Sequence, residues 1–311
     1  MENLIFSLNA TIPIFLLMVV GYFLNHVGVL DDVLANKMNS FVFKVSLPLL
    51  LFTDVYEADF TELWDTKFVA FCVIATILSI LISIGLSYFL KDRSIQGEFI
   101  QACYRSSAAL LGIALVQNIY PTVGMAPLML MSVVFTYNLI SVVILSVFKK
   151  ERTKVNFKKT IKGILTNPLI IGIVAGVIVS LLPFELLGVC TKTINYISST
   201  ATPLGLMAMG ATFDFSKAKG EIKPALFCTF MKLFGFCIIF LPVGVLLGYT
   251  QQALVAILIM LGSSTTVSGY VMAKTMGHEG LLTSSVVMLT TLLSAFSITF
   301  WLTILKAFGL V

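Results

Sequence analysis

The sequence predicts an all-α polytopic membrane protein whose ten transmembrane helices form two inverted repeats of five helices. Of its 311 residues, 58% are hydrophobic and only 11% are charged, whereas an ordinary soluble domain is about 25% charged. Apolar runs long enough to cross a bilayer recur along the whole chain. This composition excludes a water-soluble fold and a disordered chain. Because the segments are apolar on every face, an outer-membrane barrel of alternating strands is excluded as well.

Hydropathy windows of about 19 residues give the expected spans. They cover residues 4–27, 39–56, 68–90, 98–120, 125–148, 164–182, 194–212, 225–249, 253–274 and 281–305. With the N-terminus outside, the inner loops hold fourteen Lys and Arg residues and the outer loops three, namely Lys67, Lys192 and Lys306. Basic residues favour the cytoplasmic side. We therefore expect a multi-pass protein of the plasma (inner) membrane with both termini extracellular or periplasmic.

The net charge of +5 comes from basic residues in the short loops between spans, where they set the membrane topology. We therefore expect no nucleic-acid partner. The expected partner is the lipid bilayer. Motifs for other chemistry are missing from the sequence. There is no HExxH, no Gly-Lys-Ser/Thr phosphate loop, no pair of intramembrane Asp residues and no His pair placed for haem. The five cysteines form no CxxC motif. We expect no enzyme activity, no metal and no cofactor.

Weak self-similarity between the two halves indicates an internal repeat, as is common in secondary transporters. Each repeat has five spans, an odd number, so the two halves must insert with opposite orientation. We divide the chain into a first repeat (1–148, helices 1–5), a basic cytoplasmic loop (149–163) and a second repeat (164–311, helices 6–10). The matched residues are Pro13 with Pro168, Gly21 with Gly176 and Pro48 with Pro203 at an offset of 155, and Ser106-Ser107 with Ser263-Ser264 and Gly112 with Gly269 at an offset of 157.

Expected helices 4 and 9 both place a Ser pair shortly before a Gly in mid-span. Gly lowers helix stability by about 1 kcal/mol, and Ser or Thr side chains can satisfy backbone groups that unwinding frees. Half-helix ends then offer N–H donors to an anionic substrate. Close helix packing through small residues is the alternative. The matching placement in both halves favours a substrate site, with candidate residues Arg105, Ser106, Ser107, Gly112, Asn138, Ser263, Ser264, Thr265, Thr266 and Gly269.

Cations inside the spans are the other candidates. Arg105 directly precedes the first Ser pair, and a charge at mid-bilayer costs roughly 2.5–3.5 kcal/mol and is normally partnered or functional. Lys44 lies four residues before Pro48 and is expected to face the cavity beside it, in a supporting or coupling role. Snorkelling to the surface is the alternative for both cations. Lys232 matches no motif and is expected to snorkel or pack. The amide of Asn138 can join helices instead of contacting substrate.

With these residues in view, the chain resembles the auxin efflux carrier family along essentially its whole length. The most specific segments are NSFVFKVSLPLLLF (39–52) and YVMAKTMGHEGLLTSSVVMLTTLLS (270–294). The resemblance implies that helices 4 and 9 cross at mid-bilayer, as in sodium/proton antiporters and bile-acid symporters. It also implies a scaffold of helices 1, 2, 6 and 7, a transport domain of helices 3–5 and 8–10 that moves like an elevator, and a homodimer.

The expected function is secondary transport of a small organic anion, such as a carboxylate or an auxin-like acid. One alternative is a sodium-coupled organic-anion symporter of the bile-acid type, in which hydroxyls of helix 9 would bind sodium. The other alternative is a non-transporting membrane receptor, which would be expected to carry a soluble signalling domain.

Overall fold

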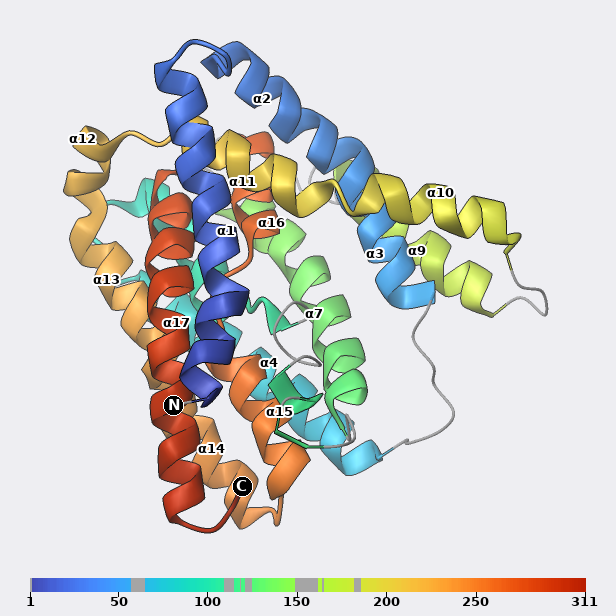
Figure 1. Ribbon diagram of the computed structural model, residues 1–311, viewed down its shortest axis with the longest axis vertical. Coiled ribbons are helices and arrows are strands. Elements are labelled where there is room, and N and C mark those ends of the chain that lie inside the picture. The colour runs from blue at the N-terminus through green and yellow to red at the C-terminus, as the bar shows by residue number, and fades with distance from the viewer. Residues whose placement is uncertain are drawn as a thin grey trace.

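The computed structural model describes residues 2–56, 65–108, 115–117, 119–120, 125–148, 162–163, 165–181 and 186–311. Within these ranges every regular element is a helix and there is no strand (Figure 1). The elements are α1 (Glu2–His26), α2 (Asp32–Phe41), η1 (Val42–Ser46), α3 (Leu47–Tyr56), α4 (Thr66–Ser87), η2 (Arg93–Ile95), α5 (Gln96–Tyr104), α7 (Ala126–Val147), α9 (Pro168–Ser180), α10 (Gly188–Ser198), α11 (Ala201–Ala211), α12 (Phe215–Ala218), η3 (Lys219–Glu221), α13 (Ile222–Phe230), η4 (Met231–Gly235), α14 (Phe236–Leu246), α15 (Gln251–Gly262), α16 (Val267–Thr275) and α17 (Leu281–Ala307).

Six helical segments in the described part of the chain are long and apolar enough to cross a membrane. They are Asp32–Tyr56, Thr66–Ser87, Ala126–Val147, Phe215–Leu246, Gln251–Thr275 and Leu281–Ala307, and two shorter apolar helices are Thr11–His26 and Pro168–Ser180. Large apolar side chains face outward from them, as Phe23, Ile74 and Leu246 do. Only a lipid environment makes so much exposed apolar surface favourable. The protein is a multi-pass membrane protein, and the count of ten spans stays a prediction.

The buried apolar side chains form two main clusters. The first joins α4, α5, α7, α13, α14, α15 and α17 around residues such as Phe68, Phe99 and Phe236. The second joins α1, η1, α3, α9 and α11, and it also takes in side chains of α7 and α16 such as Val142 and Val271. The molecule therefore has one helix group with its own core and a second group that packs against α7 and α16.

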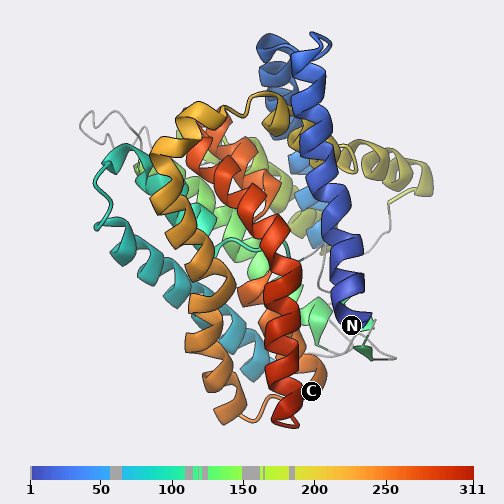
Figure 2. The same cartoon turned by 60° about the vertical axis from the view of Figure 1, so that its left-hand side comes forward.

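The second cluster depends on very close helix packing. A Cβ atom added to Gly21 of α1 would overlap the backbone of Met207 in α11, and one added to Gly176 of α9 would lie 2.8 Å from the backbone oxygen of Phe52 in α3. Glycine lets membrane helices approach until their backbones touch. The two pairs correspond to each other at the offset of 155 found in the sequence. Figure 1 shows α3 and α9 next to each other on the right of the view, and Figure 2 shows α1, in blue, rising from the N-terminus.

Substituting Gly21 by Ala is expected to destabilise the protein by about 1–3 kcal/mol, because the new methyl group would force α1 away from α11. The matched control is Gly85→Ala in α4, where an added Cβ meets nothing within 4 Å. Thermal unfolding of both purified variants in detergent measures the effect. Equal melting temperatures for the two variants would contradict the close approach of α1 and α11.

Candidate functional site

The two helices expected to be broken are interrupted at their Ser pairs. Helix α5 ends at Tyr104, and residues 105–107 are non-helical. Helix α15 ends at Gly262, and α16 begins only after the non-helical residues 263–266. Gly269, expected to contribute to the second interruption, instead lies in the first turn of α16, because the Thr266 hydroxyl caps that helix. Gly112 lies outside the described residues.

The two interruptions lie against each other. The backbone N–H of Ser107 donates to the carbonyl oxygen of Ser264 at 2.8 Å. The hydroxyls of Ser106 and Ser263 also hydrogen-bond to each other. Both contacts join residues that match at the sequence offset of 157. Positions far apart in the chain therefore meet at one point inside the molecule.

Hydrogen bonds between the two interruptions serve backbone groups at and beside the helix ends. A helix end leaves carbonyl oxygens without helical partners, and in a membrane such groups must find partners within the protein. The Ser106 hydroxyl donates at 3.2 Å to the carbonyl of Ile259, which also accepts a hydrogen bond from the N–H of Ser263. The Thr265 hydroxyl donates to the carbonyl of Ala102 at 2.7 Å, and the N–H of Thr265 donates to the Thr290 hydroxyl. Small hydroxyl side chains therefore stabilise both non-helical segments by hydrogen bonds.

Arg105 is the only charge in the first interruption, and its side chain is buried with 3% of its surface exposed. Snorkelling is therefore excluded for this residue. Its acceptors are all neutral, and in the described part of the chain no carboxylate pairs with it. The bonds run from Nε to Thr266 Oγ1 (2.7 Å), from Nη1 to Ser141 Oγ (3.0 Å) and Met272 Sδ (3.2 Å), and from Nη2 to Asn138 Oδ1 (2.5 Å) and Ser268 Oγ (2.7 Å).

A cavity of about 300 Å³ opens beside this cation. One wall comes from η1, α3 and α11 and is mostly apolar, whereas the other comes from the two interruptions, α7 and α16. Its volume is at the lower end of the range for small-molecule sites. The lining residues are Val42, Leu47, Leu50, Leu51, Asp54, Ala201 and Thr202 on the first wall, and Arg105, Ser106, Ser107, Val134, Tyr137, Asn138, Thr266, Val267, Ser268 and Val271 on the second.

The expected site residues divide into those at the cavity and those away from it. Five line it: Arg105, Ser106, Ser107, Asn138 and Thr266. Three others are buried away from the cavity and belong to the second interruption: Ser263, Ser264 and Thr265.

Lys44 does not face this cavity. Its side chain is exposed, and neither Lys44 nor Pro48 lines the space. The expectation that both share one face assumed a regular α-helix. Residues 42–46 instead form the π-helical turn η1, in which the spacing between neighbours on one face is changed. Pro48 packs against Gly172 of α9.

Lys232 is the opposite case, because it is buried with 1% of its surface exposed. It lies in the second π-helical turn, η4, and its ammonium donates to the carbonyl of Leu261 at 2.7 Å. That carbonyl belongs to the last turn of α15, where a cation satisfies a free acceptor and the negative end of the helix dipole. Of the two alternatives expected for Lys232, snorkelling is excluded and packing holds, since the side chain supports the helix end beside the second interruption.

Sequence reasoning missed the residues that complete the Arg105 network. Ser141 lies three residues after Asn138, on the same face of the apolar helix α7, and its hydroxyl also bonds the Tyr104 hydroxyl at 2.7 Å. That spacing of polar residues was a usable signal. Ser268 and Met272 lie four residues apart in α16, where nothing in the sequence distinguishes them from packing residues.

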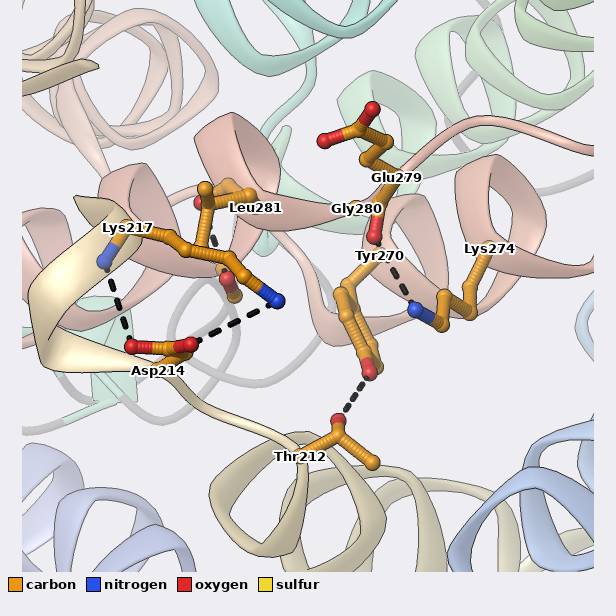
Figure 3. A pocket seen from close by; sticks show the side chains of 9 residues that line it. Thr212, Asp214, Lys217, Tyr270, Lys274, Glu279, Gly280 and Leu281 are labelled. Carbon is orange, nitrogen blue, oxygen red and sulfur yellow. Dashed lines mark hydrogen bonds and ion pairs between the residues drawn. The ribbon is translucent and has the colours of Figure 1, made fainter. Parts of the chain in front are cut away.

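A second, more open pocket of about 390 Å³ lies at the end of α11 and α16 (Figure 3). Its charged groups are engaged within the chain: Lys217 pairs with Asp214 at 3.5 Å, and Lys274 donates to the backbone oxygen of Glu279 at 3.1 Å. Hydrogen bonds from the backbone N–H groups of Lys217 and Ser216 lower the pKa of Asp214. The buried cavity at Arg105 is therefore the stronger candidate site.

Membrane-spanning helices with an interrupted, polar interior define a multi-pass membrane protein with the kind of internal site that transporters use. Residues 6–302 match the model of a family described as membrane transport protein, which is the domain of the auxin efflux carrier family. The chain belongs to this family and is a membrane transporter. This confirms the resemblance seen in the sequence. No curated protein matches the chain in sequence.

Proposed function

We propose that the protein is a secondary transporter that carries a small organic anion, such as a carboxylate or an auxin-like acid, across the plasma membrane. The observation that carries this proposal is the buried Arg105 beside the cavity, bonded by neutral groups alone among the described residues. A buried charge without a counter-charge is unfavourable. At 4 Å and an effective dielectric constant of 20, an anion is attracted to it by about 4 kcal/mol. Asp54 lines the opposite wall of the cavity but is not among the bond partners of Arg105, so an anionic substrate would supply the counter-charge.

In this proposal the five lining residues of the expected set contact or surround the substrate: Arg105, Ser106, Ser107, Asn138 and Thr266. Ser263, Ser264, Thr265 and Gly269 shape the second interruption from behind, and Gly112 is assigned from the sequence alone. Lys44 and Pro48 act away from the cavity, in support of helix 2. No cofactor or metal is required.

The mechanism we propose is alternating access by an elevator movement. Helices 1, 2, 6 and 7 would form the scaffold, helices 3–5 and 8–10 the moving domain, and a homodimer the assembly. The two apolar clusters and the position of the cavity between them support this division. The contact of Gly21 with Met207 corresponds to that of Gly176 with Phe52 at an offset of 155. Ser106 bonds its match at an offset of 157, Ser263. Both observations support an inverted repeat.

Carboxylates are expected to stabilise the purified protein against heat, whereas their amides are not. A panel of acetate, phenylacetate, indole-3-acetate, malate, succinate and citrate, with phenylacetamide as the uncharged control, tests this by thermal shift. A ligand at 100 times its dissociation constant adds about 2.7 kcal/mol. A panel without any stabilising carboxylate, or equal shifts from phenylacetate and phenylacetamide, would contradict the proposal.

Flux measurements on proteoliposomes separate the remaining alternatives. Uptake of the carboxylate that binds most tightly, compared in sodium and in choline buffers, distinguishes a sodium-coupled symporter from a carrier that needs no sodium. Binding without flux in either buffer would identify a receptor.

The topology is also a proposal, with both termini outside and the basic loop 149–163 in the cytoplasm. In Figures 1 and 2 the two termini lie toward one end of the molecule, and in Figure 1 α12 lies toward the other. Single cysteines at positions 3 and 309 in a cysteine-free background are expected to react with an impermeant thiol reagent on intact cells, and a cysteine at position 153 is not. Labelling at position 153 alone would contradict the proposal and indicate the opposite orientation in the membrane.

A further inference from the structure

Every N–H group of the Arg105 guanidinium already has a hydrogen-bond acceptor within the protein. Arginine carries five N–H donors, and the structure gives it five acceptors, one on Nε and two on each Nη. A bidentate Arg–carboxylate contact needs two free N–H groups. A substrate anion could bind the guanidinium directly only by displacing two of these protein acceptors.

Three of the five acceptors face the cavity, and two do not. Asn138, Thr266 and Ser268 line it, whereas Ser141 and Met272 are not among the lining residues. Arg105 therefore lines the cavity together with groups that already accept hydrogen bonds from its guanidinium. A hydroxyl that accepts from a cation becomes a stronger donor itself, because bonds in a chain polarise one another.

The hydrogen positions of the two hydroxyls follow from counting lone pairs, since a hydroxyl has two lone pairs and one hydrogen. Thr266 Oγ1 accepts from Arg105 Nε at 2.7 Å and from the N–H of Gly269 at 3.3 Å, which uses both lone pairs. Its hydrogen must then serve the 2.8 Å contact with Ser268 Oγ. Ser268 Oγ accepts this bond and one from Arg105 Nη2 at 2.7 Å. The hydroxyl hydrogen of Ser268 is left for an acceptor outside this network.

We propose that the Ser268 hydroxyl is a direct hydrogen-bond donor to the substrate anion, and that Arg105 is a positioning residue that acts through Thr266 and Ser268. This inference rests on the proposed function of the cavity as an anion site. It assigns direct recognition to a polarised hydroxyl on the cavity wall, next to a cation whose N–H groups are already bonded within the protein.

Ser268→Ala and Ser141→Ala form a matched pair for the test, since both remove a hydroxyl that accepts from Arg105 and only the first faces the cavity. Affinity is measured by calorimetry for the carboxylate of the panel above that stabilises the protein most. We expect Ser268→Ala to weaken its affinity about tenfold, as loss of a charge-assisted bond of about 1.4 kcal/mol does, and Ser141→Ala less than threefold. Ser268→Thr, which keeps the hydroxyl, is expected to retain the affinity.

The melting temperature without carboxylate shows whether each variant is folded, and Ser268→Cys provides a second variant of similar volume with a weaker donor. Equal affinities in Ser268→Ala and Ser141→Ala, together with a large loss in Arg105→Met, would contradict the role of Ser268 and leave the proposed anion site standing. Unchanged affinity in Arg105→Met would overturn the proposed anion site itself.

Discussion

Substitution of Arg105 by Met is expected to weaken carboxylate binding by about 100-fold, or about 2.8 kcal/mol, and to abolish transport at substrate concentrations that saturate the wild type. The reason is that Met retains an unbranched apolar stem but removes the only cation that lines the cavity in the described part of the chain. Calorimetry and proteoliposome flux, with the carboxylate selected by thermal shift, measure the two effects.

Arg105→Lys is the informative companion to this variant. Lysine keeps the charge but has three donors in place of five and no planar fork, so it can serve only part of the acceptor set around Arg105. We expect an affinity between those of wild type and Arg105→Met. Affinity for an uncharged amide should be the same in all three proteins. A parallel loss of amide and carboxylate binding would show that Arg105 shapes the cavity without providing electrostatic recognition.

The folded state should tolerate the loss of Arg105 better than binding does. Removal of an unpaired buried charge relieves its desolvation cost, which offsets the loss of its hydrogen bonds. The hydroxyls of Ser141, Ser268 and Thr266 can rotate toward other acceptors, whereas the amide of Asn138 keeps its own bond to the carbonyl of Val134 at 2.8 Å. We therefore expect that Arg105→Met lowers carboxylate affinity strongly and lowers the free energy of unfolding little, which is the result expected for a functional cation.

The interruptions could be predicted from the sequence because their chemistry is local. A chain break in a membrane needs nearby polar groups that can bond backbone carbonyls, and the Ser pairs and the adjacent Thr265 mark where such groups lie in the sequence. The partners of Arg105 could not be predicted in the same way. Met272 belongs to another helix, and only the packing of that helix brings it to the guanidinium.

The ends of the spans show a second limit of sequence reasoning. Hydropathy predicts that helix 2 starts at residue 39, but α2 begins at Asp32, where the carboxylate of Asp31 accepts a hydrogen bond from the N–H of Leu34. This first part of the helix is amphipathic and carries Lys37. A hydropathy window averages its polar side with its apolar side, whereas the cap and the hydrogen bonds determine where a helix starts.

The two intramembrane lysines show how hydropathy and spacing fail for π-helical turns. Lys44 in η1 is exposed and Lys232 in η4 is buried, although the sequence predicted a cavity-facing position for the first and could not decide between snorkelling and packing for the second. A π-turn inserts an extra residue and rotates the rest of the helix about its axis. The face on which a side chain lies can then be read only from the folded helix.

Lys232→Ala is expected to lower the free energy of unfolding by about 2–5 kcal/mol, as truncation of a large buried side chain does, and to leave the carbonyl of Leu261 at the end of α15 without its partner. This corresponds to a fall in melting temperature on the order of 5–10 °C. Lys44→Ala is the matched control, because it removes the same side chain from an exposed position in the other π-helical turn and should change stability by less than about 0.5 kcal/mol. Thermal unfolding in detergent compares the two. Equal melting temperatures would mean that Lys232 does not support the end of α15, and Lys232→Met, which keeps most of the volume, separates loss of packing from loss of the hydrogen bond.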